Sequence, residues 1–377
     1  MKTLILLSMM LCFLSLAYGQ ISTNKNYNLL IGTYTSPGKS NGIYVYTFNV
    51  ETGDFSHKSE VGGIKNPSFL AISNDRKHVY SVSEIGDRKG TISAFVFDAP
   101  SGKLTFLNGV TSGGDGPCYV SVDKKNKYVF AGNYSGGSLS AIPINADGTL
   151  SEDIQSIKHF GSSINRDQDK AHVHATVLSP DDRYLFVPDL GTDKVNIYKV
   201  DINQSKPLTP AEPAFAKVET GSGPRHFTFH PNGKFAYVIQ EITGLVTGYD
   251  YKDGKLTEKQ TVTMPSAGFT GTIDAADIHI SPDGKFLYGS LRGDINEIVI
   301  YAIDSNGKLV CAGRNSTMGT GPRNFAIDPA GNFLLVGNQR SDEIVIFKRN
   351  QKTGLLTPTG KNISIGAPVC LKFVAAD

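Results

Sequence analysis

The chain has no tryptophan and only four cysteines. Cys12 lies in the apolar N-terminal run, and the remaining three, Cys118, Cys311 and Cys370, are odd in number and show no C-x-x-C spacing. This pattern argues against a disulfide framework and against a zinc site. It also gives little support to Cys118 as a nucleophile, because an isolated buried thiol usually serves as a small apolar group.

An excess of charge of either sign is also missing. The formal net charge is only +2 over 377 residues, so nothing indicates a nucleic-acid-binding surface. After the first residues, no apolar run is long enough to cross a membrane, and we expect no membrane span. What is abundant is glycine and proline, 40 and 18 residues, which favour many turns over long helices.

The N-terminal residues have the pattern of a targeting segment. Lys2 gives the positive start, residues 4–16 form a short apolar run, and residues 17–19 (Ala-Tyr-Gly) form a small-x-small cleavage site. We expect a signal peptide over residues 1–19 and one mature domain over residues 20–377, located in the periplasm or secreted. An uncleaved anchor fits less well, because the run is short for a membrane span.

A repeat dominates the rest of the chain. In one unit, residues 227–230 read as a first strand, residues 231–233 (Pro-Asn-Gly) as a turn and residues 235–239 as a second strand. A third strand and a weaker fourth follow in most units. Successive units open 46 to 56 residues apart, at Pro67, Pro117, Val173, Pro224, Ala275, Pro322 and Pro368.

Four short strands in a unit of this length are typical of a β-propeller blade. A β-sandwich array fits less well, because one face of each blade is buried only by the next blade. The last opening, residues 367–374, has room for one strand, and residues 28–34, 42–48 and 53–61 supply the other three. We therefore predict an all-β fold: a seven-bladed β-propeller of four-stranded antiparallel blades, closed by pairing of the C-terminal strand with the N-terminal strands.

The repeat predicts two rings of side chains at one end of the central channel, because antiparallel pairing puts the start of each first strand beside the end of each second strand. The residues directly after the openings are Ser68, Cys118, His174, Arg225, Ala276, Arg323 and Val369. The residues seventeen positions after the openings are Glu84, Tyr134, Leu190, Glu241, Arg292 and Gln339. A register shifted by one residue would instead bring in Asn133, Asp189 and Asn338.

Acid, base and guanidinium groups concentrate in one sector of these rings. His174, Arg225, Glu241 and Arg292 fall on consecutive blades, and we predict them to be the catalytic residues. A paired acid and base flanked by guanidinium groups suits an anionic substrate with a reacting carbonyl. Solvated rim charges are the alternative interpretation.

Further residues are candidates for substrate binding: His172, Arg323, Glu84, Asn133 and Arg166. Arg166 lies in a polar segment, residues 161–170, which either enters the mouth of the channel or is an ordinary surface insertion. His172 and His174 would point the same way on a regular strand and could pair at a metal, but no carboxylate cluster with ligand spacing accompanies them. We expect neither a metal nor a cofactor.

Four segments resemble the seven-bladed lactonase family, which includes bacterial 6-phosphogluconolactonases and fungal carboxy-muconate lactonizing enzymes. These are residues 31–35 (IGTYT), 171–174 (AHVH), 223–226 (GPRH) and 281–288 (SPDGKFLY). The resemblance covers essentially the whole mature chain. It implies a metal-free site with one His, one Glu and arginines, which fall on His174, Glu241, Arg225 and Arg292.

The functional expectation is hydrolysis of a small anionic or sugar lactone by a monomeric enzyme. Water would attack the ring carbonyl, either His174 or Glu241 would take its proton, and Arg225 and Arg292 would hold the oxyanion and the substrate's anionic group. An exported enzyme would meet a lactone other than the phosphorylated one made in the cytoplasm. Two alternatives stay open: a muconate-type cycloisomerase, which uses the same groups in the reverse sense, and a non-enzymatic propeller that binds a ligand or a protein.

Overall fold

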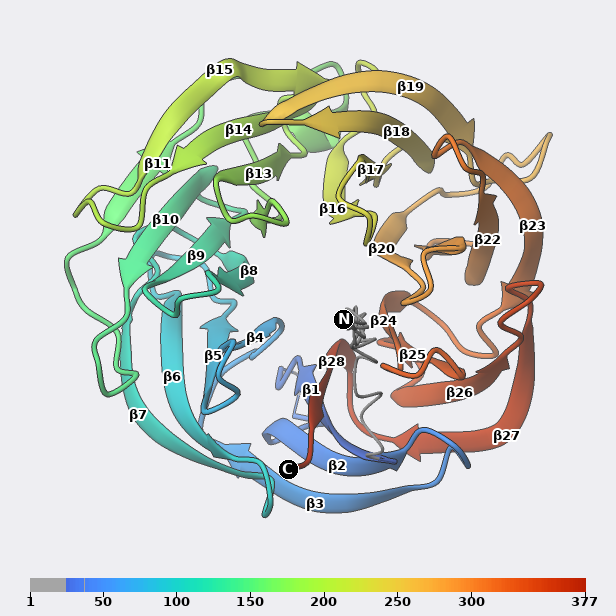
Figure 1. Cartoon of the computed structure of the whole chain (residues 1–377), viewed down its shortest axis with the longest axis horizontal. Coiled ribbons are helices and arrows are strands. Elements are labelled where there is room, and N and C mark those ends of the chain that lie inside the picture. Colours follow the sequence, from blue (N-terminus) through green and yellow to red (C-terminus); the bar gives the residue numbers. More distant parts are fainter. Residues whose placement is uncertain (1–24, 37) are drawn as a thin grey trace, which may run out of the picture.

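The computed structural model describes residues 25–36 and 38–377, which form seven four-stranded antiparallel sheets arranged in a ring (Figure 1). The predicted signal peptide lies outside the described residues. Each sheet is one blade, with its first strand beside the central channel and its fourth at the rim. The predicted seven-bladed propeller is confirmed.

The strands of blades 1 to 3 are as follows. Blade 1 contains β4 (Leu70–Ile72), β5 (His78–Ser83), β6 (Thr91–Asp98) and β7 (Lys103–Thr111). Blade 2 contains β8 (Pro117–Val122), β9 (Tyr128–Asn133), β10 (Ser138–Pro143) and β11 (Gln155–Lys158). Blade 3 contains β12 (Val177–Leu178), β13 (Tyr184–Asp189), β14 (Lys194–Val200) and β15 (Leu208–Lys217).

Blades 4 to 7 follow the same order. Blade 4 contains β16 (Pro224–Phe229), β17 (Phe235–Gln240), β18 (Leu245–Lys252) and β19 (Lys255–Thr263). Blade 5 contains β20 (Ala275–Ile280), β21 (Phe286–Leu291), β22 (Glu297–Ile303) and β23 (Leu309–Ser316). Blade 6 contains β24 (Pro322–Ile327), β25 (Phe333–Asn338), β26 (Glu343–Arg349) and β27 (Leu356–Ser364). Blade 7 contains β28 (Pro368–Ala375), β1 (Asn26–Thr33), β2 (Gly42–Asn49) and β3 (Phe55–Gly62).

Blade 7 closes the ring with strands from both ends of the chain. β28 pairs antiparallel with β1, from Tyr27 opposite Ala375 to Thr33 opposite Pro368. This is the closure that the incomplete seventh repeat predicts. The fourth strand of the blade begins at Phe55, two residues later than expected, because Gly53 forms part of the preceding turn with a φ of +70°.

Aromatic side chains join neighbouring blades. Phe186 of blade 3 stacks on Phe227 of blade 4, with ring centroids 5.2 Å apart. Tyr237 buries its ring and donates its hydroxyl hydrogen to the carbonyl of Gly307 in the next blade, at 2.8 Å. Tyr288 does the same to Gly354 at 2.8 Å. A buried tyrosine needs such a partner for its hydroxyl, so these contacts combine apolar burial with fixed spacing between blades.

The first strand of blade 3 departs from the pattern. The repeat places the opening of this blade at Val173, but β12 starts only at Val177. The N–H of His174 donates to the carbonyl of Pro188 at 3.0 Å, and Pro188 has no N–H with which to complete the ladder. The segment is therefore held beside β13 by a few single contacts, which include a bridge between Val173 and Asp189.

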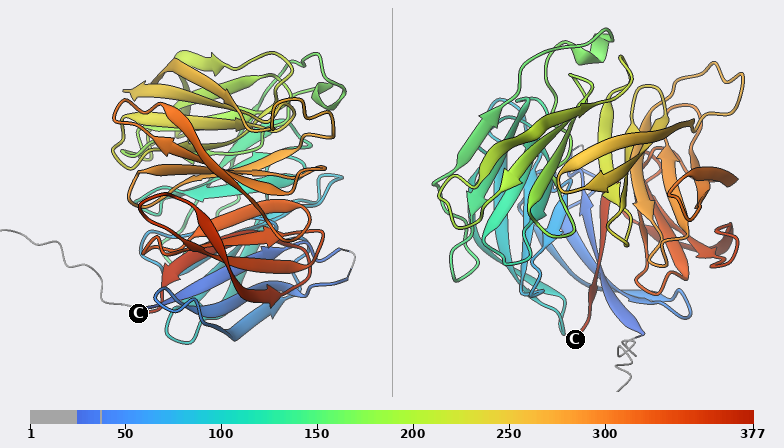
Figure 2. Two further views of the ribbon diagram at one scale, coloured as in Figure 1. Left: turned by 90° about the vertical axis from the view of Figure 1, so that its right-hand side faces the viewer. Right: turned by 45° about the horizontal axis from the view of Figure 1, so that its top comes forward.

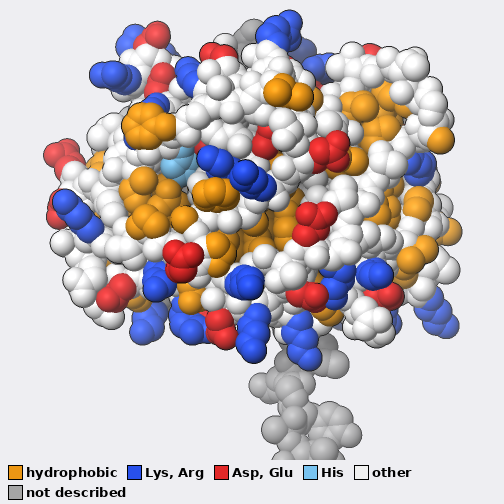
Figure 3. Space-filling view, turned by 90° about the horizontal axis from the view of Figure 1, so that it is seen from above, with side chains coloured by type: hydrophobic (Ala, Val, Ile, Leu, Met, Phe, Trp, Pro, Cys, Tyr) orange, Lys and Arg blue, Asp and Glu red, His pale blue; other side chains and the backbone are white. Residues whose placement is uncertain are grey.

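The two ends of the channel differ. The short helix η1 (Arg166–Gln168) projects from one face of the ring, and the C-terminus lies at the opposite face (Figure 2). From the side, Lys and Arg are interspersed with Asp and Glu, so this view shows no patch of a single sign (Figure 3). Among the described residues, no helix has the length and apolar character needed to span a membrane.

Candidate functional site

A β-bulge at the start of the inner strands leaves the residue after the opening without a partner in the ladder. In blade 4, Pro224 pairs with Gln240 whereas His226 pairs with Ile239, so Arg225 is the extra residue. The same bulge occurs in blades 2 and 6, where Cys118 and Arg323 are the extra residues. A bulge re-aims a side chain, and here all three extra residues line one cavity in the channel.

Glu241 is the centre of a cluster of charged and polar side chains at the end of the channel where these inner strands begin. Its Oε2 atom lies 2.6 Å from Nε of Arg225 and 3.2 Å from Nη2 of Arg292. Nε2 of His174 lies 3.9 Å from the same oxygen. The four predicted catalytic residues are therefore brought together, from three consecutive blades.

Arg292 has a second carboxylate partner, which sequence reasoning missed. Its Nη2 atom lies 2.5 Å from Oδ1 of Asp274, the residue just before the opening of blade 5. Nη2 also donates to the carbonyl of Ala275 at 3.3 Å. The Nε atom of Arg292 is buried and has no hydrogen-bond partner among the described residues.

The charges set the protonation states of the acid and the base. Burial alone would raise the pKa of Glu241, but Arg292, Arg225 and Arg323 together outweigh it and hold the pKa below its ordinary value. Burial, reinforced by Arg225, lowers the pKa of His174 well below its ordinary value. At neutral pH the site therefore contains a carboxylate beside a neutral imidazole. Burial also lowers the pKa of Arg292, to about 10, and this side chain stays cationic.

Across the cavity, Arg323 faces a second acidic group. Its guanidinium lies over the ring of Tyr34, 5.4 Å from the centroid. Tyr34 donates a hydrogen bond to Oε2 of Glu84 at 2.8 Å, and the Ser68 hydroxyl donates to the same oxygen. Burial raises the pKa of Tyr34, which keeps it a donor. Arg323 itself makes no hydrogen bond or ion pair of 4 Å or less with a described residue, so its donors are free.

His174, Arg225 and Arg323 line one cavity at the channel mouth, whereas Glu241, Arg292, Tyr34 and Glu84 are not among its lining residues. Its walls include Ser68, Cys118, His174, Arg225, Arg323 and Val369, six of the seven residues of the first predicted ring. Arg323 is expected from its position to lie outside the sector of His174, but it lines the same cavity. The reason is the narrowness of the channel, across which residues two or three blades apart still face one another.

A family model described as "Lactonase, 7-bladed beta-propeller" matches residues 28–373. The chain belongs to the seven-bladed β-propeller lactonase family. The resemblance expected from the sequence over essentially the whole mature chain is thereby confirmed.

Curated relatives and a solved structure agree with this membership. A 6-phosphogluconolactonase of Formosa agariphila is 40% identical over 92% of this chain and 99% of its own length. A 6-phosphogluconolactonase of Bacillus subtilis is 34% identical over 91% of this chain and 97% of its own length. The structure of a periplasmic gluconolactonase of Pseudomonas aeruginosa superposes with a TM-score of 0.89 at 39% identity, covering 93% of this chain and 100% of that one. These relatives are named as lactone-hydrolysing enzymes.

Of the five predicted substrate-binding residues only Arg323 lines the mouth cavity, and Glu84 hydrogen-bonds Ser68 of its wall and Tyr34. Asn133 is fully buried and donates to Ser138 and Ser140 at 3.2 Å, so its side chain packs within blade 2. Arg166 is exposed and pairs with its neighbour Asp167 at 3.2 Å. His172 is not among the residues that line the cavity, and its side chain contacts Tyr134 and Asp169 instead.

His172 and His174 do not point the same way, because the segment that carries them is not a regular strand. The ring of His172 stacks on Tyr134, with centroids 4.4 Å apart, while its Nε2 lies 3.1 Å from Oδ1 of Asp169. His174 instead meets Tyr134 edge to face, with centroids 5.4 Å apart. Within residues 25–36 and 38–377, no three His, Cys, Asp or Glu side chains gather in a way that could hold a metal ion.

Cys118 lies beside the imidazole of His174, with Sγ 3.8 Å from Nδ1. Burial raises the pKa of its thiol, so the reactive thiolate is disfavoured. The thiol thus lines the cavity as a small, neutral group.

Proposed function

We propose that this protein hydrolyses the ester bond of a sugar lactone, with water attacking the ring carbonyl and His174 acting as general base. The observation that carries the proposal is the cluster at Glu241 in a member of the lactonase family: two guanidinium groups lie within 3.2 Å of its Oε2 and an imidazole lies 3.9 Å away. Two members of the cluster, His174 and Arg225, line one cavity. These groups are what ester hydrolysis needs, namely a proton acceptor and cations for the developing oxyanion.

His174 suits the role of base better than Glu241. Oε2 of Glu241 already pairs with Arg225 at 2.6 Å and with Arg292 at 3.2 Å, so this oxygen is not free to take a proton from water. Nε2 of His174 makes no hydrogen bond with a described residue, and in the tautomer that carries its proton on Nδ1 this nitrogen has a free lone pair for a proton from water. Once Nε2 takes the proton from water, the imidazolium gains the attraction of the carboxylate 3.9 Å away.

The arginines divide two further tasks. Arg225 lines the cavity beside His174, so it is placed to stabilise the oxyanion that forms when water adds to the carbonyl. Arg323 also lines the cavity and makes no hydrogen bond or ion pair of 4 Å or less with a described residue. Its free donors suit the hydroxyl, carboxylate or phosphate groups at the other end of the lactone.

The names of the relatives point to two substrate classes, a phosphorylated and an unphosphorylated sugar lactone. Two curated relatives are named for the phosphorylated lactone, whereas the solved periplasmic relative is named a gluconolactonase. The predicted signal peptide favours a periplasmic or secreted enzyme that acts on an unphosphorylated sugar lactone. We adopt this assignment for the present chain. N-terminal sequencing of the exported fraction checks it, and an intact Met1 in the cytosol would favour the phosphorylated substrate.

The decisive experiment is a panel of lactones with the purified mature protein. Glucono-1,5-lactone, its 6-phosphate and muconolactones are each followed by acid release and product analysis, with spontaneous hydrolysis subtracted. The proposal predicts opening of a sugar lactone. Conversion of muconates alone would establish the cycloisomerase instead, and inactivity on the whole panel would favour the binding propeller.

A further inference from the structure

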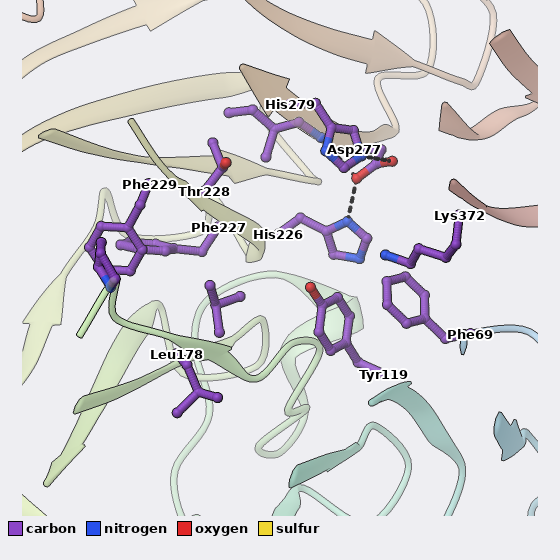
Figure 4. Close-up of a pocket in the computed structure, with 13 residues that line it drawn as sticks. Phe69, Tyr119, Leu178, His226, Phe227, Thr228, Phe229, Asp277, His279 and Lys372 are labelled. Carbon is purple, nitrogen blue, oxygen red and sulfur yellow. Dashed lines mark hydrogen bonds and ion pairs between the residues drawn. The ribbon is translucent and has the colours of Figure 1, made fainter. Parts of the chain in front are cut away.

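A layer of side chains lies below the mouth cavity and separates it from a second cavity at the opposite end of the channel. Phe69, Tyr119, His226 and Asp277 each come two residues after a repeat opening and face one another across the channel (Figure 4). Phe69 and Tyr119 stack with centroids 4.0 Å apart, and the edge contact between Tyr119 and His226 measures 5.4 Å. Phe69 and His226 line both cavities.

His226 links a buried carboxylate to the proposed site. Its Nδ1 lies 2.7 Å from Oδ1 of Asp277, and its Nε2 lies 3.1 Å from Nη1 of Arg225. A carboxylate can only accept and a guanidinium can only donate. Nδ1 must therefore carry the proton, and Nε2 must accept from Arg225. The two neighbours fix one tautomer of a neutral imidazole, and burial agrees with this because it lowers the pKa of His226 to about 3.

Asp277 is itself held on all sides. Its Oδ2 accepts from Nε2 of His279 at 2.9 Å, from the N–H of Phe325 at 3.2 Å and from the side chain of Asn324. Its Oδ1 accepts from the N–H of Ile278 at 3.0 Å in addition to His226. Burial would raise the pKa of Asp277, but His279 and His226 outweigh it and hold the pKa well below its ordinary value. The carboxylate is a fixed, charged anchor.

The contacts of Arg225 show how Asp277, acting through His226, helps to hold the guanidinium in one orientation. Nη1 donates to the carbonyl of Ala276 at 2.6 Å as well as to His226, and Nε lies 2.6 Å from Glu241. Nη2 is the remaining guanidinium nitrogen, and it has no partner among the described residues. Because a guanidinium is planar, fixing two of its nitrogens fixes the direction in which the third donates.

We propose that Asp277 and His226 are positioning residues for the lactonase reaction. Asp277 sets the tautomer and orientation of His226, His226 accepts from Nη1 of Arg225, and Nη2 of Arg225 is thereby aimed at the substrate. This inference rests on the proposed function of the mouth cavity, but it makes a claim about the protein alone that can be tested separately.

That claim is the tautomer of His226, which nitrogen-15 NMR of the imidazoles reports. Among the eight histidines, the signals of His226 are those that disappear in His226→Phe. In the wild type we expect the Nδ1–H form at neutral pH. In Asp277→Asn, an amide NH₂ turned toward His226 would force the Nε2–H form, which can no longer accept from Arg225. A wild-type His226 that is protonated, or in the Nε2–H form, would overturn the inference whether or not the protein opens lactones.

Kinetics supply the second readout, with variants matched in size. His226→Phe keeps a ring but loses the acceptor, and we expect kcat to fall by up to about 100-fold, the effect of a misplacement of about 1 Å. His226→Gln can present its amide oxygen near the position of Nε2 and should recover about tenfold of that loss. His230→Gln is the control, because His230 contacts Gly284 and Asn232 rather than Asp277 or Arg225, and it should stay within about twofold of wild type.

If His226 only stabilised the fold, the kcat values of its variants would fall in proportion to their loss of melting temperature. Equal kcat for His226→Phe and His226→Gln at equal melting temperature would therefore overturn the inference. If the wild type opens no lactone, the proposed function fails instead, and the NMR measurement alone decides whether Asp277 and His226 position Arg225.

Discussion

Nε of Arg225 lies 2.6 Å from Oε2 of Glu241, although the two residues are sixteen positions apart in the sequence. The hairpin of β16 and β17 brings them together, because the start of the first strand lies beside the end of the second. The Arg225 side chain is only 2% exposed and that of Glu241 24% exposed. In this environment a missing partner is costly, which makes the pair testable.

Glu241→Gln should weaken both catalysis and stability. The change releases Arg225 and removes one of the two carboxylates near Arg292, so we expect kcat to fall by about 10²–10³-fold, as when a preorganised electrostatic group is lost. An uncompensated buried arginine should lower the free energy of unfolding by about 3 kcal/mol or more. Steady-state kinetics and urea unfolding followed by circular dichroism measure the two effects. Unchanged values of both would show that Glu241 is a solvated rim charge.

Arg323→Ala should affect substrate binding rather than folding. Because this arginine has no hydrogen bond or ion pair of 4 Å or less with a described residue, its removal leaves no buried polar group unpaired and loses only the contact with the ring of Tyr34. We expect KM to rise by about 10- to 100-fold, the worth of a charged hydrogen bond of about 1.5–3 kcal/mol, with little change in melting temperature. Arg166→Ala removes an exposed arginine whose side chain is 92% accessible, and is the matched control. Equal KM values for the two variants would contradict the assignment of Arg323.

Acid should destabilise the protein through His226. Burial, reinforced by Arg225, lowers its pKa to about 3, whereas the unfolded chain has the ordinary value of 6.5. Between these pH values the unfolded state binds a proton that the native state does not. The free energy of unfolding should therefore fall as pH decreases, by at most about 1.4 kcal/mol per unit for this one group.

His226→Gln isolates this contribution, since the other titrating groups are shared. The difference in unfolding free energy between wild type and variant should be constant above about pH 7 and should shift against the wild type as the pH falls from about 6 to 4. Parallel stability curves over that range would mean that the native state also binds the proton.

Removal of residues 367–377 should abolish cooperative folding. These residues contain β28, which is the inner strand of blade 7 and pairs with β1 along its whole length. Without it, β1 becomes an exposed edge at the channel, and blades 1 and 6 lose a neighbour. Thermal unfolding and solubility of the truncated chain measure this. A transition identical to that of the full chain would contradict closure by strand pairing.

The sequence could predict the arrangement of blades and the cluster of four residues because both follow from one repeat. The spacing of the openings fixes which residues come first on each inner strand, and the bulge keeps Arg225 and Arg323 in that position. Arg292 was found in the same way, by its distance from the opening at Ala275.

The repeat could not predict the side-chain contacts that involve residues outside the two rings or that depend on local departures from the regular strand. Asp274 precedes its opening, where other blades carry different residues, so only the structure reveals its ion pair with Arg292. Tyr34 reaches the site because blade 7 is assembled from both ends of the chain. The direction of His172 depends on the broken ladder beside Pro188, and that of Asn133 on a polar pocket within blade 2.

The most direct test of the account compares wild type and His174→Ala on the sugar lactone that the wild type opens fastest. His174 is expected to act mainly in the transition state, so KM should change little. The value of kcat should fall by about 10²–10⁴-fold, the usual contribution of a positioned general base. A His174→Ala variant that opens the lactone with the kcat of the wild type would contradict the central claim that this imidazole activates the attacking water.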